Sequence, residues 1–289
     1  MKRKHDGKVE EDTNQDLLEE TLAGYLDIKR RKAPEGYFEV ESYPLKPPFS
    51  YASIVQNKET TEYLYIVDEL PLTREEMEAY ARMKNILEYE LRAPEDEESF
   101  IQAFQRQLPE IMANHSKALR TISPIGTKKI IYYSERDIAG YGKIDPLMFD
   151  PYVEDISCSG VNKPIFLWHR KYENIKTNVY FRNEEDLEDF VIKIVHKAGK
   201  HVSLAFPIVD VTLPNKHRLA VSYGREVTPA GTSFTIRKFR EDPFTIIDLI
   251  KNETINESIA AYLWLLVENK MSLIMIGATG AGKTTSLNA

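Results

Sequence analysis

The sequence predicts an α+β region on the N-terminal side, followed by the beginning of an α/β domain. Short alternating stretches rich in Tyr, Val and Ile recur between residues 37 and 238, as in half-buried strands. Amphipathic stretches with helix-start signals lie between them. Near the end of the chain, an apolar run over residues 273–276 leads into a glycine-rich loop, which is typical of a strand–loop–helix unit.

The composition limits the class of protein. The chain has 289 residues, 42% of them hydrophobic and 29% charged, which is typical of a folded globular protein. A single cysteine, Cys158, excludes an internal disulfide and a cysteine-based metal site, and we expect it to be a core residue. No stretch approaches the ~20 apolar residues of a membrane-spanning helix, and the start lacks a signal peptide, so we expect a cytoplasmic protein. The net charge of -7 argues against general nucleic-acid binding.

Breaks in the pattern divide the chain into four segments. Residues 1–33 form a charged tail and a short helix, and residues 34–95 a small α+β subdomain. Residues 96–239 form a second domain of helices and a mixed sheet. Residues 240–289 comprise a linker and the start of a P-loop domain.

The strands and helices follow from residue periodicity. In the small subdomain, Thr73 and Glu76 form a capping box, and the helix it opens has an apolar stripe of Met77, Tyr80, Met83, Leu87 and Leu91. Further helices are expected over residues 99–121, 128–139 and 245–252, and another between Asn183, as N-cap, and Gly199. A second capping box, Thr254 with Glu257, opens the last long helix, with Ile259, Tyr262, Leu263, Leu266 and Val267 buried. The expected strands cover residues 37–43, 50–55, 62–67, 153–157, 164–168, 179–181, 208–213, 217–222 and 233–238.

A phosphate-binding motif, G-x-x-x-x-G-K-[ST], follows the apolar run at 273–276. Its residues are Gly277, Ala278, Thr279, Gly280, Ala281, Gly282, Lys283, Thr284 and Thr285. Glycines allow the backbone N–H groups to surround a phosphate closely. Lys283 adds a positive charge near the β and γ phosphates, and the Thr284 hydroxyl suits Mg²⁺. The loop therefore predicts binding of ATP with Mg²⁺, with Lys283 and Thr284 as catalytic candidates and Thr284 as the metal ligand; the alternative is a chance glycine-rich turn.

The sequence ends at Ala289, about one turn into the helix that follows the motif. A P-loop ATPase also needs an acidic strand end for Mg²⁺ and a residue that positions water. We therefore expect a larger ATPase of which this is the N-terminal part, and a fragment that is inactive by itself.

Four ordered motifs resemble one family. They are Ile-Asp-Pro-Leu at 144–147, Asp-Pro-Tyr-Val-Glu-Asp-Ile at 150–156, Gly-Thr-Ser-Phe-Thr-Ile-Arg-Lys-Phe at 231–239, and the stretch 277–288. Together they resemble the secretion ATPase superfamily, above all the archaeal ATPases of type II secretion and type IV pilus assembly. The resemblance runs from about residue 37 to the end of the chain. It implies a RecA-like P-loop domain, with ATP bound between this domain and the preceding one.

The same resemblance implies partners and further site residues. The family forms a cytoplasmic homo-hexamer that docks on a platform protein of the inner membrane, so membrane association would be peripheral, at its inner face. Its N-terminal domain sends arginines toward the nucleotide phosphates. Arg218 and Arg237 lie in matching motifs, and Arg225 is a weaker candidate. On the residues alone, solvated strand ends are the better explanation of Arg218 and Arg237, and only the matching motifs favour a role at the phosphates.

The leading hypothesis is an ATP-driven motor subunit for protein secretion or for assembly of a type IV pilus or archaellum. One alternative is an unrelated P-loop ATPase, for example one that remodels DNA. Another is a non-enzymatic module, in which the residues before Phe239 only dock partners.

Overall fold

The computed structural model describes residues 33–95, 98–239, 244–278 and 281–289. It contains two compact units, 1–238 and 239–289. The expected N-terminal tail and the helix within it lie outside the described residues.

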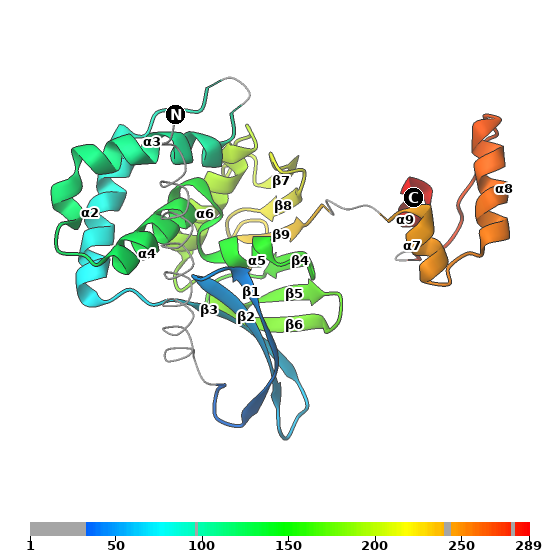
Figure 1. The fold of residues 1–289 in the computed structure, drawn as a ribbon, viewed down its shortest axis with the longest axis horizontal. Coiled ribbons are helices and arrows are strands. Elements are labelled where there is room, and N and C mark those ends of the chain that lie inside the picture. Colours follow the sequence, from blue (N-terminus) through cyan, green and yellow to red (C-terminus); the bar gives the residue numbers. More distant parts are fainter. Residues whose placement is uncertain (1–32, 96–97, 240–243, 279–280) are drawn as a thin grey trace, which may run out of the picture. The chain divides into compact units, whose positions relative to one another are not determined.

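Within the described part, the first unit is built on one nine-stranded sheet (Figure 1). The strands are β1 (Tyr37–Lys46), β2 (Ser50–Asn57), β3 (Tyr63–Glu69), β4 (Val153–Cys158), β5 (Pro164–His169), β6 (Glu173–Tyr180), β7 (Ile208–Thr212), β8 (Arg218–Ser222) and β9 (Ser233–Arg237). Their order in the sheet is β1-β2-β3-β6-β5-β4-β9-β8-β7. All neighbouring pairs are antiparallel except β3 and β6, which are parallel.

The sheet runs through both of the expected segments 34–95 and 96–239, because β3 of the first pairs with β6 of the second. The expected strand at 179–181 is wrong in its extent, since β6 begins at Glu173. A turn after His169 brings β6 back along β5, and that pairing holds the polar residues of β6 in the sheet.

Two short helices and one long helix contribute to the main core. They are η3 (Gly142–Ile144), α5 (Asp145–Phe149) and α6 (Glu184–Lys197). The apolar face of α6 packs with the inner side chains of β4, β5, β8 and β9 in one cluster, which also includes Cys158. The N-cap of α6 is confirmed, since the Asn183 side chain accepts from the Asp186 N–H at 2.7 Å. Gly199, after its end, has a φ of 69°, which favours glycine.

A second core lies among α2 (Arg74–Glu90), α3 (Phe100–Asn114), η1 (Ser116–Leu119), α4 (Pro124–Ser134) and the π-helix η2 (Glu135–Ala139). The Thr73 capping box is confirmed, but the expected stripe is wrong at Met77, which is 51% exposed. Met83 and Leu87 of that stripe are buried against the neighbouring helices as expected, and Ala79 joins them there. The third expected helix starts earlier, at Pro124, because the Ser123 hydroxyl caps it.

A buried ion pair joins α2 to α4. Lys129 is 1% exposed and donates to the Glu76 carboxylate and to the carbonyl of Pro71. The same carboxylate accepts from the Thr73 N–H at 2.8 Å, so one side chain completes the cap and neutralises the lysine.

The described part of the second unit contains three helices, α7 (Ile246–Lys251), α8 (Glu257–Glu268) and α9 (Lys283–Asn288). The expected capping box of Thr254 with Glu257 is wrong: Asn256 caps α8 by accepting from the Ile259 N–H at 2.9 Å. An Asn two residues after the Thr offers an equally good cap and moves the helix start.

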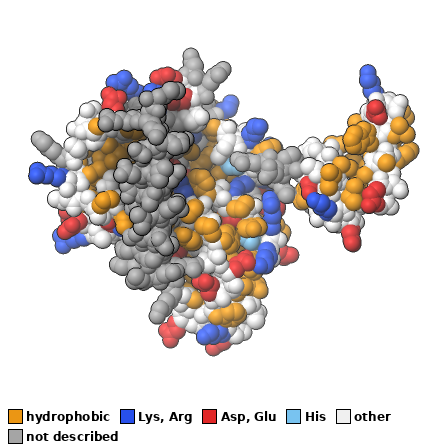
Figure 2. All heavy atoms as spheres, in the orientation of Figure 1, with side chains coloured by type: hydrophobic (Ala, Val, Ile, Leu, Met, Phe, Trp, Pro, Cys, Tyr) orange, Lys and Arg blue, Asp and Glu red, His pale blue; other side chains and the backbone are white. Residues whose placement is uncertain are grey.

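The apolar residues of this unit are largely exposed. The expected strand at 273–276 is not formed, because no strand of the described unit offers it a hydrogen-bonding neighbour. The expected burial along α8 is also wrong: Ala260 is its one described buried residue, while Tyr262 is 61% and Val267 63% exposed. Apolar side chains spread over the surface of α8 (Figure 2).

No helix in the described residues combines the length and the apolar character needed to cross a membrane.

Candidate functional site

The glycine-rich loop connects the segment after α8 to α9. Thr279 and Gly280 lie outside the described residues, and Gly277, Ala278, Ala281 and Gly282 flank them. The expected helix after the loop is confirmed: α9 begins at Lys283, with Gly282 as its N-cap. The Ser286 N–H donates to the Gly282 carbonyl at 2.9 Å and closes the first turn.

The local backbone explains why glycine occupies positions 277 and 282. Gly282 has a φ of 79°, a left-handed conformation that side chains other than glycine adopt at a cost. At Gly277, an added Cβ would lie 3.2 Å from the Cβ of Ala281 and 3.5 Å from the Cγ of Lys283. The start of the loop therefore packs closely against Ala281 and Lys283, and a side chain at Gly277 would be tight against Ala281.

Lys283 points its ammonium group back over this loop. Its Nζ donates to the carbonyl of Gly277 at 2.8 Å and to that of Ala278. Lys283 is the only charged side chain from position 277 to 285. The next two residues, Thr284 and Thr285, lie in the first turn of α9, and Thr284 is exposed. A cation held at a glycine loop, with an adjacent exposed hydroxyl, fits a nucleotide polyphosphate and Mg²⁺.

The two candidate arginines lie side by side in the first unit. Arg218 of β8 and Arg237 of β9 are directly opposite each other in the antiparallel ladder. Arg218 makes a forked contact with Asp210 of β7, at 3.0 Å for both hydrogen bonds. The Nε of Arg237 donates to Asp155 of β4 at 3.1 Å. The structure thus brings the two arginines together on one sheet face.

These ion pairs are on the surface. The side chains of Arg218 and Arg237 are 70% and 75% exposed. The hydrogen bond from Arg218 holds the pKa of Asp210 below its usual range. Exposed pairs contribute little net stability, so each guanidinium can exchange its carboxylate for another anion at small cost.

A shallow hollow that we did not expect from the sequence lies on the exposed sheet face near the arginines. It has a volume of about 600 Å³ and is lined by residues of β4, β7, β8 and β9 together with nearby loops. Its walls carry the hydroxyl side chains of Ser157, Ser222, Ser233 and Thr235. The sequence signal was the placing of small hydroxyl residues at alternate positions of β9, between the buried Phe234 and Ile236.

A buried carboxylate supports the strand end that carries Arg237. Asp150 is 0% exposed, and its Oδ2 accepts from the hydroxyls of Tyr43 at 2.7 Å and Tyr65 at 2.6 Å. Burial and the nearby negative charge raise the pKa of Tyr43 far above its ordinary value, so it stays a donor. Lys238, next to Arg237, donates to the carbonyl of Asp150. The Asp150 turn therefore holds the end of β9 in place.

Across the described ranges, no group of three or more His, Cys, Asp and Glu side chains is arranged to hold a metal ion.

Comparison with known proteins places the chain among secretion proteins. The family described as "Type II/IV secretion system protein" matches residues 139–289. The uncharacterized protein MJ0900 of Methanocaldococcus jannaschii is 40% identical over 168 residues, which are 58% of this chain and 30% of that relative. The uncharacterized protein MJ1288 of the same organism is 36% identical over 212 residues, which are 71% of this chain and 81% of the relative.

The chain thus spans less than a third of the length of MJ0900. Among solved structures, the VirB11 ATPase from the Brucella suis type IV secretion system, in complex with sulphate, is 16% identical to this chain. The match covers 50% of this chain and 49% of VirB11, with a TM-score of 0.34.

Proposed function

The chain belongs to the type II/IV secretion system protein family, a family of P-loop secretion ATPases, and on that premise we propose that it is part of an ATP-hydrolysing motor subunit. The work it powers is protein secretion, or assembly of a type IV pilus or archaellum. The observation that carries the proposal is the loop at 277–285. In it, Gly277 packs closely against Ala281, Gly282 has a left-handed backbone conformation, and the Lys283 ammonium donates to the loop carbonyls.

In this function, residues 277–285 hold the phosphates of ATP. Lys283 exchanges the loop carbonyls for phosphate oxygens, and the Thr284 hydroxyl would hold Mg²⁺. Mg²⁺ held there would supply positive charge against the phosphate oxygens. The backbone N–H groups of the loop orient the phosphate chain, and Lys283 compensates part of its charge.

Arg218 and Arg237 supply further positive charge in the proposed mechanism. Each releases its aspartate, Asp210 or Asp155, and reaches a phosphate of the nucleotide when the two units close. A guanidinium fork suits phosphate oxygens well, and two neighbouring forks on adjacent strands form one anion-binding edge. Binding energy that is gained only on closure couples the nucleotide to movement, which a motor requires.

For the assembly, we propose a homo-hexameric ring in the cytoplasm. It docks on a platform protein at the inner face of the cell membrane, so its membrane association is peripheral. Family membership supports this arrangement.

Two measurements on the full-length protein test the proposal: phosphate release from ATP with and without Mg²⁺, and the mass of the assembly in each condition. We expect Mg²⁺-dependent turnover and a hexamer. A protein that neither binds nor hydrolyses ATP would contradict the motor. Turnover that depends on added DNA would instead favour a DNA-remodelling ATPase.

Alanine at Arg237 is expected to lower ATP turnover of the full-length protein by about tenfold or more, and alanine at Arg218 to act similarly. Arg237→Lys should recover only part of the rate, because an ammonium group cannot make the forked contact. The matched control is Arg82→Ala, an exposed arginine on α2, which should leave turnover unchanged. Parental rates in both alanine variants, with normal assembly, would show that the arginines are solvated strand ends.

A further inference from the structure

A crevice, separate from the hollow near Arg218 and Arg237, lies in the first unit where the parallel strands β3 and β6 separate. β3 and β6 pair only at Leu64 with Lys176 and at Tyr65 with Thr177. After these pairs, the Asn178 side chain takes the place of backbone hydrogen bonds between the two strands. Its amide oxygen accepts from the Val67 N–H at 2.8 Å, and its Nδ2 donates to the Val67 carbonyl at 3.0 Å. Beyond this bridge the strands diverge at their carboxyl ends.

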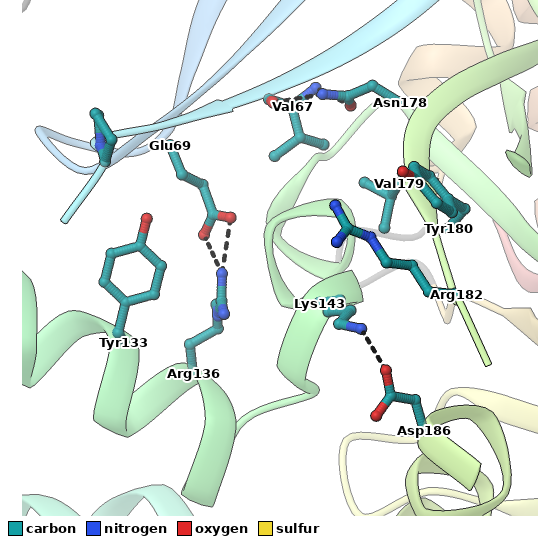
Figure 3. Close-up of a pocket in the computed structure, with 11 residues that line it drawn as sticks. Val67, Glu69, Tyr133, Arg136, Lys143, Asn178, Val179, Tyr180, Arg182 and Asp186 are labelled. Atoms are coloured by element: carbon teal, nitrogen blue, oxygen red, sulfur yellow. Dashed lines mark hydrogen bonds and ion pairs between the residues drawn. The ribbon is translucent and has the colours of Figure 1, made fainter. Parts of the chain in front are cut away.

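The crevice has a volume of about 520 Å³, within the usual range for small-molecule sites. Its walls come from β3, β6, α4 with η2, η3 and the start of α6 (Figure 3). Three cations line it, Arg136, Lys143 and Arg182, against two carboxylates, Glu69 and Asp186. Asp137, beside the crevice, also pairs with Arg136, so the carboxylates here match the cations in number.

Arg136 is a fixed charge in this wall. Its side chain is 12% exposed, and Nη1 donates to both oxygens of Glu69, at 2.9 and 2.7 Å. Its Nε donates to Asp137 at 2.7 Å. The guanidinium also lies 4.6 Å from the ring centre of Tyr133. It is therefore held in one orientation, with Nη2 left without a hydrogen bond to any described residue.

The other two cations are available for a ligand. Lys143 contacts Asp186 at 3.3 Å, with both side chains nearly half exposed, so that pair is weak and exchangeable. Arg182 has no carboxylate partner among the described residues. Its guanidinium lies 5.9 Å from the centre of the Tyr180 ring. In Figure 3, the Lys143 ammonium is directed toward Asp186, and the Arg182 side chain extends among the lining residues from the segment after β6.

We propose that this crevice binds a phosphate group, carried by a small molecule or by a lipid headgroup, at a site distinct from the glycine-rich loop. Arg182 and Lys143 bind the phosphate oxygens directly, and Arg136, already paired with Glu69 and Asp137, offers its Nη2 as a fixed hydrogen-bond donor. A phosphate fits better than a single carboxylate because it offers enough oxygens for a guanidinium fork and an ammonium group at once. Glu69 and Asp186, paired with cations, restrict the site to a ligand with one compact anionic group.

The test uses the full-length protein with Lys283→Ala, so that phosphate binding at the glycine-rich loop is removed. Inorganic phosphate and glycerol phosphate are titrated while amide chemical shifts or heats of binding are followed. We expect saturable binding, weakened about tenfold or more by Arg182→Gln, which is the order that one charge-assisted hydrogen bond contributes. Arg182→Lys should recover part of the affinity. Arg82→Gln, on exposed α2, is the matched control and should bind like the parent.

Vesicles with a phosphorylated anionic headgroup, compared with neutral vesicles, distinguish the two sources of the phosphate. Binding of the soluble probes supports a small-molecule ligand. Binding of the anionic vesicles alone, lost in Arg182→Gln, supports a lipid headgroup. The proposal is overturned if no probe binds, if Arg182→Gln binds as tightly as the parent, or if a glutamate-rich peptide binds and the phosphates do not. ATP turnover of the protein with native Lys283 stays unchanged in Arg182→Gln, so failure here is separable from failure of the proposed motor function.

Discussion

Replacing Lys283 by alanine is expected to reduce ATP turnover by the full-length protein by roughly 10³-fold, to background. The reason is that residues 277–285 contain no other charged side chain, and the ammonium already lies at the loop, 2.8 Å from the Gly277 carbonyl. Loss of a positioned cation in phosphoryl transfer costs rate on that order. Phosphate release at saturating Mg-ATP measures the effect.

The control for this variant is Lys251→Ala. Lys251 is an exposed lysine in the last turn of α7, in the same unit, and its removal should leave turnover at the parental rate. If the Lys283→Ala protein hydrolyses ATP as fast as the parent, the loop is a structural turn and the nucleotide site lies elsewhere.

Glu76→Ala is expected to lower the free energy of unfolding by about 3–5 kcal/mol, the cost of leaving a buried charge without its partner. Lys129 is 1% exposed, and among the described residues its other hydrogen-bond partner is the Pro71 carbonyl at 3.1 Å rather than a second carboxylate. The variant also loses the reciprocal half of the Thr73 cap. Denaturant unfolding of the full chain, followed by circular dichroism, gives the change.

Glu78→Ala is the matched control, because Glu78 lies on the same helix in an exposed pair with Arg74 and should change stability by less than about 1 kcal/mol. The double variant Glu76→Leu with Lys129→Met should be more stable than Glu76→Ala, since removing both charges leaves neither one unpaired. A loss below about 1 kcal/mol in Glu76→Ala would show that water reaches Lys129.

Local signals in the sequence predicted local structure well. The Thr73 capping box and the Asn183 cap depend on residues three positions apart, and both are confirmed. The α-helix after the glycine-rich loop and the left-handed Gly199 also follow from nearby residues. Most strands were found because their alternation matches one buried face of the sheet.

Features that depend on distant residues could not be predicted. Glu76 was visible as a capping residue, but its partner Lys129 is 53 positions away. Asp150 lay in a recognised motif, yet its hydroxyl donors come from strands 85 and 107 positions earlier. For the same reason, Arg218 and Arg237 were candidates in the sequence, whereas Asp210 and Asp155 emerged as their partners only when the strands were paired.

The parallel pairing of β3 with β6 has a consequence for how the chain folds as it is made. The Asn178 amide that bridges Val67 lies 111 positions after it. At typical rates of synthesis, β1, β2 and β3 therefore wait roughly 6–22 s on the ribosome before β6 emerges. During that interval β3 is an open edge, able to pair with another nascent chain. A chain that ends before residue 173 lacks β6, so its β3 edge stays open for such pairing.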